Sequence, residues 1–408
     1  MLKINFHTTL FTAFLIIVIA VPIFQLHYLL FAILSILCYA KVSQKIVEII
    51  VYLSVILIIA LIASTFNFFT FYDWLKDFAY LSKPILAILA GFLLAKKINN
   101  FKRILKIIVA VSLLFAVIHL FKIIFFVDFS SATVSDIRRI GGLSNEIEIL
   151  AIAVLLISFK IKEINIIKNP FYKKIIIVVL LTSFCFYFSR TMLVTLFLLL
   201  LAAFGYLKIT SKGLKYGALV LTFFALFYAY LFNADIKRGQ SGFESFLYKM
   251  KNAPAEVFSP AKSIDKKNHK NLWDRWRAYE ANMALSQMST YDEYLIGKGL
   301  GSLVDLEFAA PLGEKNIRYI PILHNGYVNI LFKSGVFGLV FYLLLLFSLS
   351  LFSYKKNKNS KNTVANNLIG GLAIHYVFTT LIVTGIYNNT EPYAFILGVL
   401  LYQSSQKE

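Results

Sequence analysis

Long apolar stretches separated by short polar loops run along the whole chain. Helices of roughly 17 to 25 apolar residues are long enough to cross a bilayer. The pattern therefore predicts an all-α polytopic membrane protein. Its twelve predicted spans are 8–23, 25–40, 46–64, 78–95, 104–126, 143–159, 174–189, 191–207, 214–232, 325–353, 364–385 and 392–404.

One polar segment of about ninety residues, 233–324, interrupts this pattern between the ninth and tenth predicted spans. A connector this long is rarely passive, so we predict a partly helical, functional cap. The stretch from Asn271 to Met288 has few breakers and is expected to be a helix. The chain thus divides into helices at 1–232, the loop at 233–324 and helices at 325–408. The expected helix breakers in the loop are Pro254, Pro260, Pro311 and Pro321.

Basic residues alternate from loop to loop. Every second loop is basic, as at Lys96-Lys97 and Lys208 to Lys215. Because basic loops stay in the cytoplasm, both termini are expected there, and the long loop on the opposite, outer face. The short loops on that opposite face hold few basic residues: Lys76, Arg138 and Arg139, with Arg190 at a helix end.

The composition agrees with a membrane protein. The 408 residues are 59% hydrophobic and 15% charged, which is far more apolar than a soluble domain of this size. The net charge of +20 is explained by basic loops that face anionic membrane lipids, so nucleic acid is not an expected partner. Cys38 and Cys185 lie in apolar stretches and the six histidines are scattered, which predicts no disulfide framework, no metal and no cofactor.

Polar residues gather at four places on the outer face: Arg138-Arg139, Ser189-Arg190-Thr191, the run Trp273 to Glu280, and His324-Asn325. Arginine suits phosphate because its guanidinium is planar, charged and bidentate. Histidine exchanges protons near neutral pH. Several arginines with one histidine would therefore suit a diphosphate attached to a lipid.

Other interpretations of these residues remain open. Arg138 and Arg139 are equally explained as interfacial anchors, and Arg190 as a side chain that reaches out of the membrane. His324 alone is also explained as a residue beside a helix N-cap. Trp276 in the loop either stacks on sugars or packs the cap onto the helices.

The spacing of His324, Asn325, Gly335 and Gly338 resembles the signature of the bacterial O-antigen ligase and O-antigen polymerase superfamily. The resemblance extends to the twelve spans, with a large periplasmic loop before the tenth. Ser189-Arg190-Thr191 is similar to the family's arginine at the outer end of a helix. Arg275, followed by Tyr279-Glu280, is similar to its loop arginine.

The resemblance implies the substrates. The donor would be an oligosaccharide on undecaprenyl diphosphate, and the acceptor a sugar hydroxyl on a lipid-linked repeat unit or on lipid A–core. The reaction would need no metal. Membrane lipids are expected partners, and a chain-length regulator is a further candidate.

Roles for single residues follow from the resemblance and from their chemistry. His324 would act as general base, while Arg190, Arg275 and one of Arg138 or Arg139 would bind the diphosphate. Tyr279 and Glu280 would position Arg275, and Gly335 and Gly338 would allow close helix packing. The further candidates for substrate contacts are Arg277, Tyr279, Trp276 and Asn325.

Three functions remain open. The run from His324-Asn325-Gly326-Tyr327 to Phe332-Lys333-Ser334-Gly335 favours a polymerase, and a ligase is the alternative. A flippase for lipid-linked oligosaccharides is a third function, from a different class. Such a transporter would place its ionisable groups near the bilayer midplane. Convergence of Arg190, Arg275 and His324 at one rim would favour a transferase instead.

Overall fold

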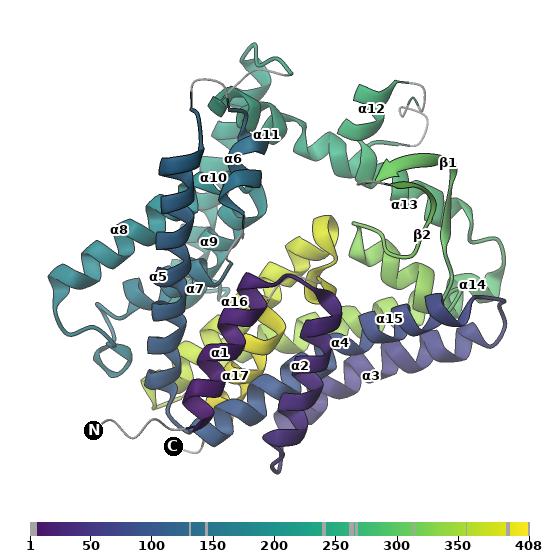
Figure 1. Ribbon diagram of the computed structural model, residues 1–408. Coiled ribbons are helices and arrows are strands. Elements are labelled where there is room, and N and C mark those ends of the chain that lie inside the picture. Colours follow the sequence, from purple (N-terminus) through teal and green to yellow (C-terminus); the bar gives the residue numbers. More distant parts are fainter. Residues whose placement is uncertain are drawn as a thin grey trace.

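The computed structural model (Figure 1) describes residues 6–129, 132–142, 146–238, 242–260, 265, 268–312, 315–355, 357–388 and 392–406. Before the long loop, the chain forms α1 (Phe6–Ala20), α2 (Phe24–Leu37), α3 (Gln44–Ser64), α4 (Phe71–Ile98), α5 (Phe101–Phe126), α6 (Val134–Gly141), α7 (Glu146–Ile157), η1 (Lys162–Ile164), α8 (Pro170–Phe186), α9 (Arg190–Ala203) and α10 (Ser211–Asn233). After the loop come α15 (Gly326–Leu351), η3 (Phe352–Tyr354), α16 (Ser360–Val383), η4 (Gly385–Tyr387) and α17 (Tyr393–Ser405).

Each predicted membrane span falls largely on a helix, although residues 143–145 of the sixth lie outside the described residues. Within the described chain, six helices are long and apolar enough to cross a membrane: α3, α4, α5, α10, α15 with η3, and α16. A seventh crossing is possible if α6 and α7, bent by 85°, act as one. Helices α1, α2, α9 and α17 are apolar but shorter. The chain is thus a helical, multi-pass membrane protein, and the count of twelve stays a prediction.

Two of the basic loops and the end of α17 meet at one end of the molecule. Lys45 Nζ donates to the Ser404 carbonyl at 2.7 Å, and Lys96 Nζ donates to the Lys41 carbonyl at 2.5 Å. The start of α1 and the end of α17 lie at this end, whereas the long loop lies at the other (Figure 1). The placement of both termini in the cytoplasm and of the long loop on the opposite face stays a prediction.

Helices α4 and α17 pack closely in the centre of the helical part. A Cβ on Gly91 would collide with the Phe395 carbonyl, and a Cβ on Gly398 with the Ile88 carbonyl. Small residues let two backbones approach in this way where lipid offers no hydrophobic driving force between helices. These contacts hold α4, which carries part of the site described below.

The long loop is partly helical, but two of the predicted boundaries are wrong. Pro254 does not end a helix, because it lies inside α11 (Gly242–Phe258). The single helix expected from Asn271 to Met288 is two helices, α12 (His269–Asp274) and α13 (Trp276–Ser286), which are separated at Arg275. Asn252 Nδ2 donates to the Asp274 carbonyl at 2.9 Å, and this contact occupies an acceptor that a continuous helix would use.

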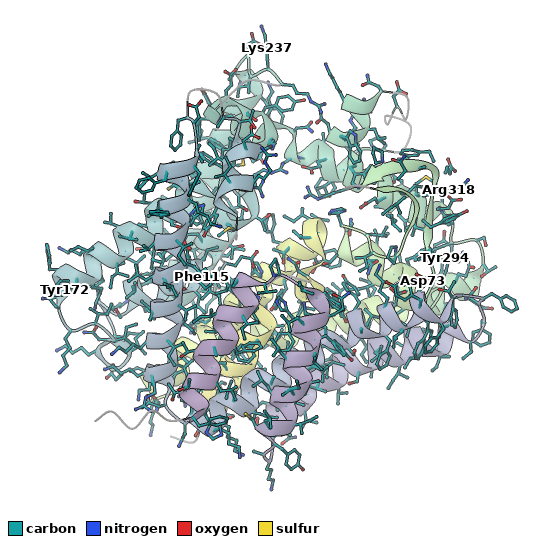
Figure 2. The ribbon with its side chains drawn as sticks, in the orientation of Figure 1. Asp73, Phe115, Tyr172, Lys237, Tyr294 and Arg318 are labelled. Atoms are coloured by element: carbon teal, nitrogen blue, oxygen red, sulfur yellow. The ribbon has the colours of Figure 1, made fainter. Side chains whose placement is uncertain are left out.

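A two-stranded hairpin, which we did not predict, follows the short helix α14 (Tyr291–Ile296). Strands β1 (Val304–Leu312) and β2 (Lys315–Ile320) pair antiparallel. Val304, Leu306 and Ala310 are buried beneath it, and Arg318 Nε donates to Asp305 Oδ1 at 2.8 Å on the outer side. Arg318 and Lys237 mark the outer edge of the loop, whereas Phe115 lies within the helical part (Figure 2).

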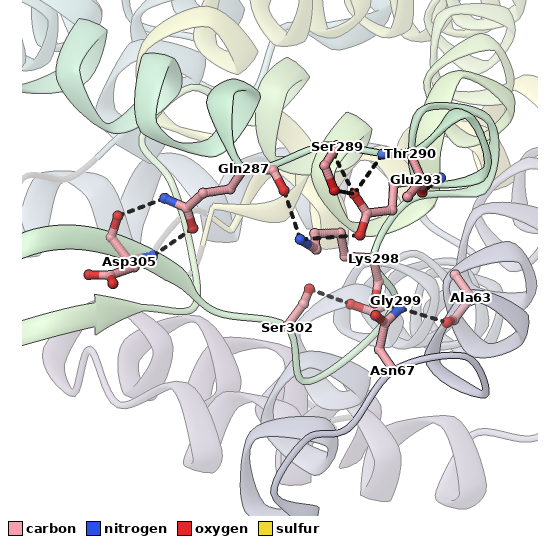
Figure 3. Close-up of polar contacts among 10 residues, drawn as sticks. All are labelled: Ala63, Asn67, Gln287, Ser289, Thr290, Glu293, Lys298, Gly299, Ser302 and Asp305. Carbon is pink, nitrogen blue, oxygen red and sulfur yellow. Dashed lines mark hydrogen bonds and ion pairs between the residues drawn. The ribbon is translucent and has the colours of Figure 1, made fainter.

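The end of the loop is fastened to the helices by polar contacts (Figure 3). Asn67, just after α3, donates to the Lys298 carbonyl at 3.0 Å, and Lys298 Nζ donates to the Gln287 carbonyl at 2.7 Å. Deeper inside, Asp77 of α4 accepts from the Gly301 amide at 2.7 Å and pairs with Lys333 of α15 at 2.5 Å. The loop therefore leads into α15 from a fixed position.

Gly335 also joins α15 to the loop, through close packing of the two backbones. Its φ of +64° breaks the regular geometry of α15, and a Cβ there would collide with the Leu295 backbone at the end of α14. Glycine adopts such a backbone without strain. The close packing expected of Gly335 is present, and its neighbour is a helix of the loop.

Candidate active site

His324 lies in the short connection between β2 and α15. Asn325 caps α15, because its side chain accepts from the Val328 amide at 3.2 Å. Asn329 Oδ1 accepts from the Leu323 amide at 3.2 Å on the other side. These contacts hold the backbone around His324, while its side chain stays 47% exposed.

Glu280 of α13 is the partner of this histidine. Its Oε2 accepts from His324 Nδ1 at 2.8 Å and from the His324 backbone amide at 3.1 Å. A carboxylate on Nδ1 selects the tautomer that carries its proton there, so Nε2 keeps a lone pair for an incoming proton. His324 also lines a cavity of about 180 Å³ with Tyr80, Thr384 and Asn388, which gives a hydroxyl group room to approach.

Arg190, at the start of α9, reaches into the long loop. Its Nη1 donates to the Lys249 carbonyl at 2.6 Å, and its Nη2 donates to Glu256 Oε2 at 2.9 Å. Both acceptors belong to α11.

Glu256 holds a second guanidinium. Its Oε1 accepts from Arg277 Nη1 of α13. Burial lowers the pKa of Arg277, and the charge of Arg190 lowers it further. Burial also lowers the pKa of Lys249, followed by the charges of Arg138 and Arg190. Glu256 thus pairs with Arg190 and Arg277 and acts electrostatically on Lys249, while Arg138 acts on Arg190 and Lys249. One carboxylate does not balance these four cationic side chains, and their surplus positive charge favours an anion. We call this set the cationic cluster: Arg138, Arg190, Lys249 and Arg277 with Glu256.

The adjacent residues Arg138 and Arg139 lie in different surroundings. Arg138 acts electrostatically on Lys249, and Lys249 Nζ donates to Ser135 Oγ of the same helix at 2.9 Å. Arg139 pairs with Asp136 at 3.1 Å, and its side chain is 79% exposed. Of the two, only Arg138 belongs to the cationic cluster.

Two adjoining apolar cavities lead away from this cluster. The first, of about 280 Å³, is lined by Arg190, Glu256 and Arg277 together with apolar residues of α9, α10, α11 and α16. The second, of about 350 Å³, is lined largely by phenylalanines and shares Phe224 and Met250 with the first. A long apolar chain would fit along this route, which we call the arginine groove.

The loop aromatics pack inside the cap. Trp276 is buried, and its ring lies 4.8 Å from that of Trp273 and 5.8 Å from that of Tyr279. The Tyr279 hydroxyl donates to the Leu306 carbonyl at 2.6 Å. These contacts favour the interpretation that Trp276 and Tyr279 pack inside the cap. They do not form an open surface on which a sugar could stack.

Helix α13 joins the histidine to the cationic cluster. Arg277 and Glu280 are three residues apart on this helix and therefore neighbours on one face, and the charge of Glu280 acts on Arg277. Arg275 lies at the break before α13. Glu280 contacts His324, and its expected role in positioning Arg275 stays a prediction.

Sequence reasoning missed Glu256 and Lys249 altogether. The assumption that Pro254 ends a helix hid α11, on which both residues lie. Glu280 was expected to position Arg275, and its pairing with His324, which lies beyond the hairpin, was not foreseen.

A known protein family matches the part of the chain that contains this candidate site. Residues 175–343 match the family model described as O-antigen ligase. The matched part runs from α8 into α15 and includes Arg190, Glu256, Arg277, Glu280 and His324. The resemblance to the O-antigen polymerase and ligase superfamily is thereby confirmed. No curated protein matches the chain.

Proposed function

We propose that the protein is a membrane glycosyltransferase that moves a glycan from undecaprenyl diphosphate to a sugar hydroxyl on the periplasmic face of the inner membrane. One observation carries the proposal. A histidine–carboxylate pair lies one helical turn from a cationic cluster, and that cluster opens into an apolar groove. The family match over the same residues supports it.

The donor follows from the shape and charge of the arginine groove. Arg190 and Arg277 provide planar donors that suit phosphate oxygens, and one carboxylate does not balance the cluster. The phenylalanine-lined extension suits a polyprenyl tail. A lipid with a diphosphate head satisfies both halves of the groove at once.

The reaction uses His324 and the arginines together. The acceptor hydroxyl attacks the anomeric carbon while His324 Nε2 takes the hydroxyl proton. The bond between that carbon and the diphosphate oxygen breaks, and its electron pair leaves with the diphosphate. Glu280 stabilises the imidazolium that forms, and the cationic cluster stabilises the departing charge. The guanidinium groups thus stabilise the leaving-group charge that a divalent metal stabilises in many glycosyltransferases.

Polymerase activity remains our preferred form of the function, and ligase activity is the alternative. A gel of surface polysaccharide from a deletion strain separates them. Lipid A–core that carries one repeat unit identifies a polymerase. Bare core, with polymer left on the lipid carrier, identifies a ligase. An unchanged pattern would contradict both.

A flippase is less well supported. The polar groups that the site needs gather where the long loop meets the helices, as the contacts of His324, Arg190 and Arg277 indicate. A transporter would instead place them around a central path near the bilayer midplane. Accumulation of unmodified donor on the cytoplasmic face of a deletion strain would favour the flippase.

A further inference from the structure

A buried polar cluster lies among three helices of the membrane part. It consists of His119 of α5, Glu148 of α7, Ser183 of α8 and Tyr187, which caps the end of α8. All four residues are buried, and Glu148 is 0% exposed. Ionisable groups are costly to bury beside membrane helices and usually mark a function. The roles given above to the cationic cluster and to His324 do not explain this second set of polar residues.

Tyr187 is the centre of the buried polar cluster. Its hydroxyl donates to Glu148 Oε1 at 2.9 Å. The imidazole of His119 stacks on its ring, with 4.0 Å between the ring centroids and 10° between the planes. His119 Nδ1 in turn lies 3.0 Å from Ser183 Oγ. Helices α5 and α7 thus fix the place where α8 ends.

Only two residues separate Tyr187 from Arg190, where α9 begins. Phe188 has a φ of +45°, a conformation that is strained for a bulky residue and persists only where its surroundings hold it. Its ring packs on that of Phe246 in α11, with 5.7 Å between the centroids. Ser189 is the N-cap of α9. This short, tightly held turn ties the position of Arg190 to that of Tyr187.

The buried polar cluster also supports the helix that carries Arg138. A Cβ on Gly141, at the end of α6, would lie 2.7 Å from His119 Nε2, so α6 packs directly on the imidazole. Arg138 lies three residues before Gly141, about one helical turn away. The charge of Arg190 acts on Arg138. The same support therefore reaches both helices, α6 and α9, that carry these two guanidinium groups, and Figure 1 shows α5 to α9 on one side of the molecule.

We propose that Tyr187, Glu148 and His119 are positioning residues that hold Arg138 and Arg190 close together before the donor binds. Two guanidinium groups repel each other, so without support they would move apart when no anion lies between them. A support that already holds them spares the diphosphate this cost, as preorganised groups do in general. This inference rests on the proposed function. It extends the donor site to residues that are not among those lining the arginine groove.

Equilibrium binding of radiolabelled undecaprenyl diphosphate tests the support. The full chain would be held in nanodiscs of phosphatidylethanolamine and phosphatidylglycerol. Tyr187→Phe keeps the ring that stacks on His119 but removes the hydrogen bond to Glu148, so we expect the Kd to rise about fivefold. Glu148→Leu should have a similar effect. Glu148→Gln should stay within about twofold of the wild type, because its amide oxygen still accepts from the tyrosine. A loss in Glu148→Gln as large as in Glu148→Leu would overturn the role of this hydrogen bond.

Tyr402→Phe is the matched control. Tyr402 is also buried, and its hydroxyl donates to Asn99 Oδ1 at 2.7 Å near the end of α17. Both variants lose one tyrosine hydrogen bond, and thermal unfolding checks that both are folded. We expect normal binding in Tyr402→Phe and weakened binding in Tyr187→Phe. Equally weakened binding in the two variants would show a general effect of lost packing and would overturn the inference.

A double-mutant cycle shows whether Tyr187 acts through Arg190. In the Arg190→Lys background, the planar guanidinium that the support positions is absent. Tyr187→Phe should therefore raise the Kd by less than about twofold in that background. A rise of about fivefold in both backgrounds would mean that the two residues act independently, which the inference does not allow.

The wild type separates this inference from the proposed function. If the wild type and Tyr187→Phe bound undecaprenyl diphosphate equally well, the positioning role would be wrong and the donor site would remain. If the wild type did not bind this lipid, the proposed function itself would be contradicted.

Discussion

Glu280 accepts two hydrogen bonds from His324, one from the ring Nδ1 at 2.8 Å and one from the backbone amide at 3.1 Å. The Glu280 side chain is only 2% exposed, whereas that of His324 is 47% exposed. The carboxylate is therefore the fixed partner, and the imidazole is the accessible one. This geometry suits a base that must take a proton from a substrate and hold the resulting charge.

We expect Glu280→Gln to lower kcat about 100-fold or more, because the neutral amide does not stabilise an imidazolium. The KM for the donor should change less than kcat, since Glu280 bonds His324 and does not itself line the arginine groove. Kinetics on purified protein measure both. Asp235→Asn removes an exposed loop carboxylate and is the matched control. Equal losses in the two variants would contradict the role of Glu280.

Lysine in place of arginine tests the cationic cluster. Arg190→Lys and Arg277→Lys keep the charge but lose the planar geometry that serves Glu256 and phosphate. We expect each to raise the KM for the donor about 10-fold, and Arg275→Lys to have the smaller effect. Arg139→Lys, on the exposed side of α6, should match the wild type. If Arg275→Lys raised the KM for the donor more than Arg277→Lys did, the phosphate site would instead lie at the break before α13.

The pH dependence of donor binding should show that the charge of Lys249 contributes to binding. Burial and the neighbouring arginines lower its pKa, so it loses its proton at a lower pH than an ordinary lysine. The affinity for undecaprenyl diphosphate should therefore fall as the pH rises through that lowered pKa. In Lys249→Arg the fall should move to higher pH, because guanidinium stays charged. Identical pH curves for variant and wild type would exclude Lys249 from the binding site.

A chelator should leave activity intact, because the arginines carry the charge stabilisation. The measurement compares transfer by purified protein before and after treatment with EDTA. Strong inhibition that a divalent ion reverses would show that the diphosphate needs a metal as well as the cationic cluster.

The helical segments could be predicted from sequence because each depends on a local pattern. An apolar run such as 46–64 lies on α3, which extends over Gln44–Ser64. The hairpin was missed although residues 304–310 alternate between apolar and polar or small side chains, a pattern typical of a strand. The expectation of an all-α fold with a partly helical loop, together with Pro311 as a breaker, obscured it.

The sequence indicated which residue types the candidate site contains, but not which of these residues pair with one another. His324 and Arg190 stand out locally, because polar residues beside membrane helices are costly. Glu256 and Glu280 stand out only when α11 and α13 are folded against the helices. The pairing of His324 with Glu280 spans 44 positions in sequence, and no local pattern predicts such a contact.

Transfer by purified protein tests the central claim most directly. Wild type and His324→Ala, each in nanodiscs, would receive a lipid-diphosphate-linked oligosaccharide, and the measurement would follow glycan growth together with released lipid diphosphate. We predict that the wild type forms both products in equal amounts. His324→Ala should form neither product, although it should still bind undecaprenyl diphosphate in the arginine groove. Substantial transfer by His324→Ala would contradict the account.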